Sequence, residues 1–178
     1  VIMENSNYDA IIIGSGLAGI YTALNIDENK RVLIITKDKI NDSNSTLAQG
    51  GIAGEINHDD EAYERHIKDT LLAGSYLNDL NALKTLVYGS SANLHQLIKF
   101  GVDFDKDDDG NILLTREGGH SERRILHAGG DATGREVMKA LIALTFTKAN
   151  IDVMEKAMVI DLVVENNKCF GVKILTDG

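Results

Sequence analysis

Apolar and polar positions follow two different periods along this chain, and the changes of period separate strands from helices. Short apolar runs at residues 8–13 and 31–36 predict buried strands. Between them, apolar residues recur at helical spacing and predict a helix over 17–29. This order of strand, helix and strand predicts an α/β fold with a parallel sheet.

The remaining pattern extends the same architecture. It predicts three further helices, at 60–73, 79–100 and 133–148. It also predicts strands at 151–154, 157–165 and 168–175, of which the last two form a hairpin with a tight turn between them. Residues 101–133 are expected to be irregular. The pattern as a whole predicts a doubly wound parallel sheet with a small antiparallel addition.

A glycine-rich turn stands where the first strand meets the first helix. In that context the spacing GxGxxG is typical of dinucleotide binding, because the glycines allow a tight turn and close approach of a pyrophosphate. The helix N-terminus adds free N–H groups and a partial positive charge. The alternative is a merely structural turn. The residues expected to hold the pyrophosphate are Gly14, Ser15, Gly16, Leu17, Ala18 and Gly19.

The end of the second strand lacks the acidic residue that binds the adenosine ribose in many dinucleotide-binding domains. Thr36 and Lys37 stand there instead and are the residues expected on the adenosine side. Their presence argues against an ordinary NAD dehydrogenase. Lys37 leaves NADP open, although a lysine at a strand end is also a common solvated charge.

Composition limits the kinds of partner and the cellular compartment that fit this chain. The net charge is −9 over 178 residues, which argues against nucleic acid as a partner. No apolar run reaches the roughly 18 residues needed for a membrane span, and no secretory signal is recognisable. The single cysteine, Cys169, cannot form an internal disulfide and is expected to be buried and inert. The expected location is the cytoplasm.

A loop rich in small and hydroxyl residues follows the second strand. Its composition suits close backbone approach to a flat or phosphorylated ligand, with a flexible surface loop as the alternative. The loop runs Asn44, Ser45, Thr46, Leu47, Ala48, Gln49, Gly50 and Gly51. Together with the glycine turn, it resembles the flavoprotein family of succinate dehydrogenases, fumarate reductases and L-aspartate oxidases.

The resemblance implies a Rossmann-like FAD-binding domain in which this loop lies along the flavin and its phosphates. Respiratory members of the family carry a histidine at the position of Asn44, and FAD is attached covalently to it. Asparagine at this position implies non-covalent FAD. The resemblance also makes Met158 and Val159 candidates for backbone contacts to adenine.

The segment from Leu114 to Arg135 resembles the L-aspartate oxidase branch of the family. There the glutamate of the TREGGHS motif orients the substrate amino group, which implies that role for Glu117. A carboxylate attracts an α-ammonium group, which succinate and fumarate lack. The alternative for Glu117 is a surface carboxylate paired with Arg116 or Arg123. His120 is a candidate for orienting the substrate or Glu117.

Two other polar features are expected to play no direct chemical part. Residues 105–112 match the first eight positions of a calcium loop, but Arg116 stands where a bidentate glutamate is needed. The acidic run is therefore expected to be a solvated turn. His127 is expected to be structural, and no metal site is expected.

The activity implied by the resemblance is oxidation of L-aspartate to iminoaspartate with hydride transfer to FAD. The FAD is reoxidised by O2 or fumarate, and the product passes to quinolinate synthase, so that the reaction is the first step of de novo NAD biosynthesis. Two alternatives stay open: a soluble fumarate reductase or succinate dehydrogenase flavoprotein, and a non-catalytic nucleotide-binding module.

The resemblance also implies a boundary. Residues 3–178 are expected to form the N-terminal part of the FAD-binding domain, with the capping domain and the C-terminal helical domain outside this chain. The fold is therefore expected to be incomplete, and the chain alone to be inactive.

Overall fold

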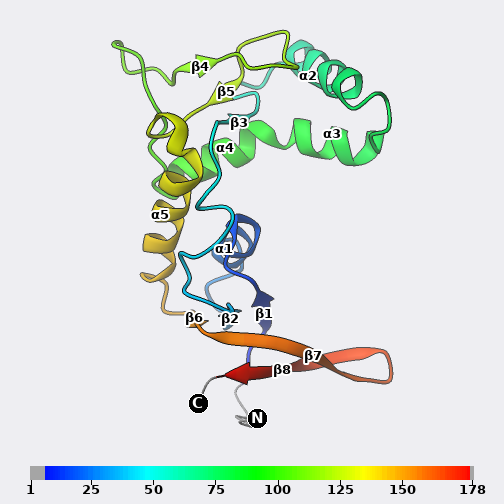
Figure 1. The fold of residues 1–178 in the computed structure, drawn as a ribbon, viewed down its shortest axis with the longest axis vertical. Helices are drawn as coiled ribbons and strands as arrows, with labels where there is room; N and C mark the ends of the chain where they lie inside the picture. The colour runs from blue at the N-terminus through cyan, green and yellow to red at the C-terminus, as the bar shows by residue number, and fades with distance from the viewer. Residues whose placement is uncertain (1–6, 177–178) are drawn as a thin grey trace. The chain divides into compact units, whose positions relative to one another are not determined.

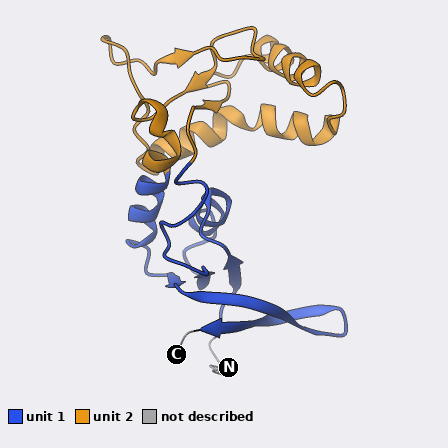
Figure 2. Cartoon of the chain, in the orientation of Figure 1, with its two compact units in different colours: residues 1–47, 138–178 blue, residues 48–137 orange. Residues whose placement is uncertain are grey.

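A computed structural model describes residues 7–176 of the chain and divides it into two compact units, shown in two colours in Figure 2. Unit 1 consists of residues 1–47 and 138–178, and unit 2 consists of residues 48–137. Positions 3 and 178, which bound the expected domain, lie outside the described residues.

Unit 1 contains a parallel sheet of three strands. They are β1 (Ala10–Ile13), β2 (Val32–Ile35) and β6 (Ile151–Met154), with β2 in the middle (Figure 1). Helix α1 (Leu17–Leu24) makes the crossover from β1 to β2 that a parallel pair requires. All four residues of β2 are buried, which explains its unbroken apolar sequence. The expected parallel α/β fold is confirmed.

A long antiparallel hairpin completes unit 1. It consists of β7 (Ala157–Glu165) and β8 (Lys168–Thr176), the orange and red arrows of Figure 1. Asn166 and Asn167 join the strands with positive φ angles of 47° and 60°, the conformation that a tight hairpin turn needs. Side chains of the hairpin, including Val159, pack against Leu33 and Ile35 of the parallel sheet.

Cys169 of β8 is exposed, so the expectation that it is buried was wrong. It pairs with Val164 near the turn of the hairpin, and the side chain of Val164 is exposed there as well. Strand periodicity alone does not show how far the buried face of a strand extends along its length.

Unit 2 combines helices with a small antiparallel sheet. The helices are α2 (Asp60–Ala73), α3 (Leu80–Tyr88), α4 (Ser90–Lys99) and the short η1 (Gly130–Ala132). The strands are β3 (Ile52–Ala53), β5 (Ile125–Leu126) and β4 (Leu114–Thr115), with β5 in the middle. Buried Tyr63, Ile67, Leu83 and Val87 form a core between α2 and α3. Helix α5 (Thr133–Thr145) has its first residues in unit 2 and its residues from Met138 onward in unit 1.

The helix expected over 79–100 is two helices that meet at Gly89. Gly89 caps α3 by donating to the Thr85 carbonyl oxygen, and a Cβ at Gly89 would lie 3.0 Å from that same oxygen. The hydroxyls of Ser90 and Ser91 then bond to the backbone of Glu55 and Ile56. The expected single helix was therefore wrong because tertiary hydrogen bonds fix a new start at residue 90.

Other boundaries also differ from the expected ones. Helix α1 ends at Leu24 rather than at 29, because Asn25 donates its side-chain amide to the Tyr21 carbonyl oxygen and caps the helix. Helix α5 ends at Thr145 rather than at 148. The segment expected to be irregular, 101–133, contains β4, β5 and η1. Among residues 7–176, no helix combines the length and the apolar character needed to cross a membrane.

Candidate functional site

The glycine turn lies between β1 and α1, and its conformation requires glycine at two positions. Gly14 has a φ angle of 105°, and its N–H donates to the Ile35 carbonyl oxygen at 2.8 Å. A Cβ on Gly19 would overlap the Gly14 carbonyl oxygen, so a side chain at Gly19 would push the helix off the turn. Gly16 is the N-cap of α1 and makes no side-chain cap. The expected tight turn at a helix N-terminus is present.

The first part of the following loop approaches this helix end. The hydroxyl of Ser45 accepts a hydrogen bond from the Leu17 N–H at 3.0 Å. A Cβ on Gly16 would lie 3.3 Å from the same oxygen. Thr46 and Leu47 close backbone turns onto Ser43 and Asn44, so residues 43–47 have a defined local structure. Ser45 is therefore placed beside the N–H groups expected to hold phosphate.

The other residues expected in unit 1 have unequal access to a ligand. Thr36 is buried, and its hydroxyl accepts a hydrogen bond from Ser15 at 3.0 Å, whereas Lys37 is exposed. Thr36 therefore holds Ser15 of the turn through this hydrogen bond, and Lys37 is the more accessible of the pair. In β7, the Val159 side chain packs into the core while Met158 is half exposed.

The second part of the loop belongs to unit 2. The Ala48 carbonyl oxygen accepts a hydrogen bond from Gly134, and Gln49 is exposed. Gly50 has a φ angle of 75°. A Cβ on Gly51 would overlap Ile125 and would lie 2.7 Å from the Leu126 carbonyl oxygen, so this backbone lies directly on β5. The absence of a side chain at Gly51 thus lets the loop backbone contact β5 directly, which a larger residue would prevent.

Glu117 lies beside that glycine pair. A Cβ on Gly50 would lie 4.0 Å from its Oε1. The partner of this carboxylate is His127, whose Nε2 lies 3.4 Å from Oε1, and not Arg116 or Arg123 as the surface-pair alternative assumed. His127 Nε2 also lies 2.9 Å from the Thr115 hydroxyl. His127 was expected to be structural, and its contact with Glu117 is a feature that the sequence analysis missed.

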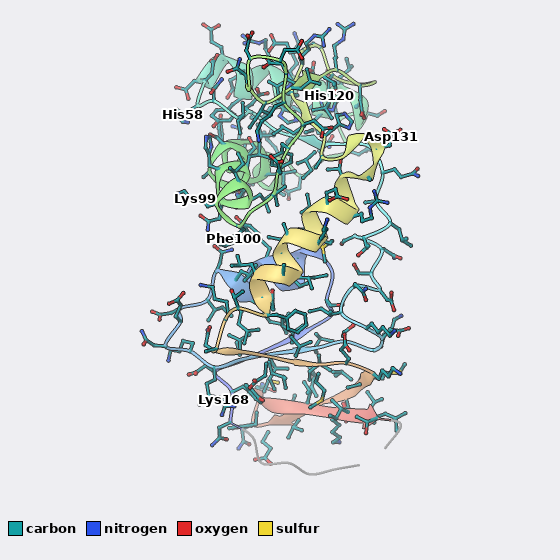
Figure 3. All side chains as sticks on the ribbon, turned by 90° about the vertical axis from the view of Figure 1, so that its left-hand side faces the viewer. His58, Lys99, Phe100, His120, Asp131 and Lys168 are labelled. Carbon is teal, nitrogen blue, oxygen red and sulfur yellow. The ribbon has the colours of Figure 1, made fainter. Side chains whose placement is uncertain are left out.

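His120, labelled in Figure 3, faces a buried charge cluster. Its Nδ1 lies 3.2 Å from a guanidinium nitrogen of Arg124, and the Arg124 side chain has no exposed surface. Because an arginine only donates, His120 Nδ1 is the acceptor and Nε2 carries the proton in a neutral ring. Arg124 also pairs with Glu55 and with Asp69, each at 2.7 Å. The sequence does not distinguish buried Arg124 from exposed Arg123.

The cluster shifts the pKa of its members in ways that follow from burial and charge. Burial raises the pKa of Glu55, and Arg124 offsets this only in part. Burial also acts to raise the pKa of Asp69, but hydrogen bonds from Ser121 and Arg124 outweigh it and bring the pKa to about 2. His66 is buried next to Arg124, and desolvation followed by repulsion from that guanidinium lowers its pKa to about 4. The cluster therefore holds Asp69 charged and His66 neutral near pH 7.

The calcium-like loop has a structural use instead. The two carboxylate oxygens of Asp105 accept hydrogen bonds from Gly129 and Gly130 at 2.9 and 3.0 Å. Asp107 accepts from the N–H groups of Asp109 and Asn111 within its own turn. Within residues 7–176, no group of three or more His, Cys, Asp or Glu side chains is arranged to hold a metal ion.

Comparison with known proteins identifies the family. Residues 9–178 match the family model described as FAD binding domain. The chain is 42% identical over 174 residues to the L-aspartate oxidase of Clostridium acetobutylicum, covering 98% of this chain and 39% of that protein. It is 39% identical over 172 residues to the chloroplastic L-aspartate oxidase of Arabidopsis thaliana, covering 94% of this chain and 26% of that protein. The chain thus spans about two fifths or less of the length of these relatives.

Solved structures agree on the fold. The Sdh1 complex of Mycobacterium smegmatis matches with a TM-score of 0.85 and 26% identity, over 95% of this chain and 31% of that one. E. coli quinol fumarate reductase FrdA matches with a TM-score of 0.89 and 24% identity, over 97% of this chain and 30% of that one, a likeness of fold alone. The glycine turn suits a dinucleotide such as FAD. Gly14 has a positive φ angle, and the missing side chain of Gly19 lets α1 pack directly against the turn. The chain belongs to the FAD binding domain family, and FAD is its cofactor.

Proposed function

We propose that the full-length protein to which this chain belongs is an L-aspartate oxidase, which oxidises L-aspartate to iminoaspartate. The relatives named L-aspartate oxidase, at 34–42% identity in the first three matches, support this activity. The observation that carries it is Glu117, a half-exposed carboxylate next to the Gly50–Gly51 backbone. A carboxylate at that place suits a substrate with an α-ammonium group.

FAD, when bound, supplies the two-electron acceptor for this oxidation. The turn from Gly14 to Gly19 holds its pyrophosphate at the start of α1. The N–H groups of Gly14 and Leu17 already donate to Ile35 and Ser45, so the pyrophosphate is bound by the other N–H groups of the turn. Residues Asn44 to Gly51 lie along the flavin and the phosphates, and Thr36 and Lys37 serve the adenosine side. Met158 and Val159 offer backbone contacts to adenine. With Asn44 at the position of the family's attachment histidine, the cofactor is held non-covalently.

Glu117 attracts and orients the α-ammonium group of aspartate. His120 has its Nδ1 occupied by Arg124, so its Nε2–H is the group that can donate to a substrate oxygen. Its ring packs edge to face against the ring of buried His66, with 5.5 Å between the two ring centroids. We assign His120 an orienting role on these grounds.

The wider setting follows from the same proposal. O2 or fumarate would accept the electrons that FAD takes from aspartate, and iminoaspartate would pass to quinolinate synthase, which would make this reaction the first step of de novo NAD biosynthesis. A single cysteine in 178 residues fits the reducing cytoplasm as the place of this reaction. Residues 3–178 form the N-terminal part of the FAD-binding domain, and the capping and C-terminal helical domains lie elsewhere in the protein.

Steady-state kinetics of the full-length protein test the proposal. With Glu117→Gln, the KM for L-aspartate should rise about 10- to 100-fold, the loss expected for a hydrogen bond to a charged group. Affinity for fumarate, which has no ammonium group, should change by less than about threefold on the same reasoning. Glu165→Gln is the matched control, because Glu165 is an exposed carboxylate at the hairpin turn. Equal loss of affinity for aspartate and fumarate in Glu117→Gln would argue against the assigned role.

The 26% identity to the Sdh1 complex of Mycobacterium smegmatis supports a second candidate, an oxidoreductase acting on succinate or fumarate. Turnover of succinate or fumarate with no turnover of aspartate would favour it. A third, non-catalytic reading as a nucleotide-binding module requires that the purified full-length protein bind FAD without turning over any of these substrates.

A further inference from the structure

The imidazole of His127 connects Glu117 to the small sheet of unit 2. Its Nε2 lies 3.4 Å from Glu117 Oε1 and 2.9 Å from Thr115 Oγ1. The His127 side chain is 15% exposed, against 49% for Glu117. A mostly buried ring thus meets a carboxylate that is open to solvent on its other side.

The backbone of His127 is anchored by a hydrogen bond, and its ring packs against a neighbouring segment. His127 directly follows β5, and its carbonyl oxygen accepts a hydrogen bond from Asp105 N–H at 2.8 Å. A Cβ on Gly51 would lie 3.1 Å from His127 Cε1, so the ring packs against the glycine pair. The ring is therefore fixed between the loop proposed to face the flavin and the carboxylate proposed to face the substrate.

A neighbouring group selects one tautomer. The Thr115 hydroxyl fits either tautomer, because it can donate to Nε2 or accept from Nε2–H while its own proton points to the Ile125 carbonyl oxygen at 3.5 Å. The Glu117 carboxylate, in contrast, can only accept. A proton on Nε2 faces the Glu117 carboxylate, whereas a lone pair there would repel it. The ring therefore presents an N–H to Glu117.

We propose that His127 is a positioning residue that holds the Glu117 carboxylate, through its Nε2–H, in the orientation that receives the substrate ammonium group. This inference rests on the proposed role of Glu117. His127 does not touch the substrate. It restricts the freedom of a half-exposed glutamate, which would otherwise rotate into solvent and lose part of its affinity for aspartate.

Three substitutions in the full-length protein separate this role from simple packing. His127→Gln can place an amide N–H near the position of Nε2, so it should keep the KM for aspartate within about threefold. His127→Phe keeps the ring but removes the N–H, and should raise that KM about 5- to 30-fold, with kcat less affected. Fumarate affinity, read from the flavin absorbance, should be unchanged in both. Should His127→Phe lose its flavin, His127→Asn, whose shorter amide does not reach the Nε2 position, takes its place.

A double-mutant cycle gives the decisive result. If His127 acts through Glu117, His127→Phe should add no further loss in the Glu117→Gln background. A loss that persists in full there, or an equal loss in His127→Gln and His127→Phe, would overturn the inference while leaving the proposed function intact. A wild-type KM in His127→Phe would do the same. If Glu117→Gln itself leaves the aspartate KM unchanged, the proposed role of Glu117 fails, and the inference falls with it.

Discussion

Arg124 is a fully buried cation that pairs closely with two carboxylates, and a third carboxylate, that of Glu122, lies 3.9 Å away. Glu55 and Asp69 each lie 2.7 Å from its guanidinium, and both are largely buried. Such an arrangement contributes little net stability relative to an apolar core, but removal of one partner leaves the others buried and unpaired. The cluster also anchors the segment that carries His120 and Ser121, because both residues bond to it.

Arg124→Met should therefore destabilise the protein by about 3–5 kcal/mol, because it leaves Glu55 and Asp69 as uncompensated carboxylates. Chemical unfolding of the full-length protein, followed by a probe in unit 2, measures this change. Arg31→Met is the matched control, since Arg31 pairs with Asp152 at an exposed site and should cost less than about 1 kcal/mol. Similar losses of stability in the two variants would contradict the larger energetic cost assigned to the buried cluster.

Gly19→Ala should weaken FAD binding about 10-fold or more and destabilise unit 1 by about 1–3 kcal/mol. The added Cβ would overlap the Gly14 carbonyl oxygen and displace α1 from the turn. Isothermal titration of the flavin-free full-length protein with FAD measures the affinity. Gly171→Ala serves as control, because a Cβ there meets no atom within 4 Å. A normal FAD affinity in Gly19→Ala would show that the turn tolerates a side chain.

The pKa of His66 gives unit 2 a defined pH dependence. Burial beside Arg124 lowers this pKa to about 4 in the folded state, against 6.5 for an exposed histidine. Above pH 6.5 the ring is neutral in both states and costs nothing. Between pH 6.5 and 4 the unfolded state binds a proton that the folded state does not, so stability falls by up to about 1.4 kcal/mol per pH unit. Asp69 has a pKa of about 2, so its contribution to the stability of the fold is lost only at lower pH.

Hydrogen exchange of the α2 amides, corrected for intrinsic rates, should therefore show protection that falls as the pH is lowered from 6.5 toward 4. His66→Gln should flatten this dependence, because glutamine does not titrate. An unchanged slope in His66→Gln would assign the dependence to other groups.

At the scale of elements, the ends of helices were set partly by local sequence and partly by neighbours. Asp59 and Asp79 cap α2 and α3 by accepting from N–H groups in the first turn, as residue type alone suggests. The start of α4 has no side-chain cap at Gly89. It is fixed by Ser90 and Ser91, which bond to residues 35 positions away in the sequence.

Asp59→Ala should cost about 1 kcal/mol of stability, because two N–H groups of α2 lose their acceptor. Asp60 lies one position later and does not cap the helix, so Asp60→Ala should cost only about 0.3 kcal/mol, through the lost interaction with the helix dipole. Thermal unfolding of the two variants compares these effects. Equal losses would indicate that charge near the helix end, and not the cap, is responsible.

At the scale of the whole molecule, the cofactor binding mode is open to a direct test. Asn44 offers no nucleophilic ring nitrogen for attachment of a flavin. Acid precipitation of the full-length protein should therefore release all of its flavin into the supernatant, where absorbance measures it. Yellow colour retained in the washed precipitate would indicate a covalent bond and would contradict the non-covalent assignment.

Local sequence patterns were enough to predict the parallel sheet of unit 1, the hairpin and a dinucleotide-binding turn, whereas the choice of FAD came from the resemblance to a flavoprotein family. Those features depend on local periodicity and on glycines at fixed spacing, which act over a few neighbouring residues. Only the tertiary structure decided that Arg124 is buried while Arg123 is exposed, that the helix breaks at Gly89, and that Glu117 meets His127. The burial of Arg124 depends on Glu55 and Asp69, and the helix break depends on bonds from residues 90 and 91 to residues 55 and 56. The contact of Glu117 with His127 depends on the pairing of β4 with β5. No local pattern encodes these tertiary contacts.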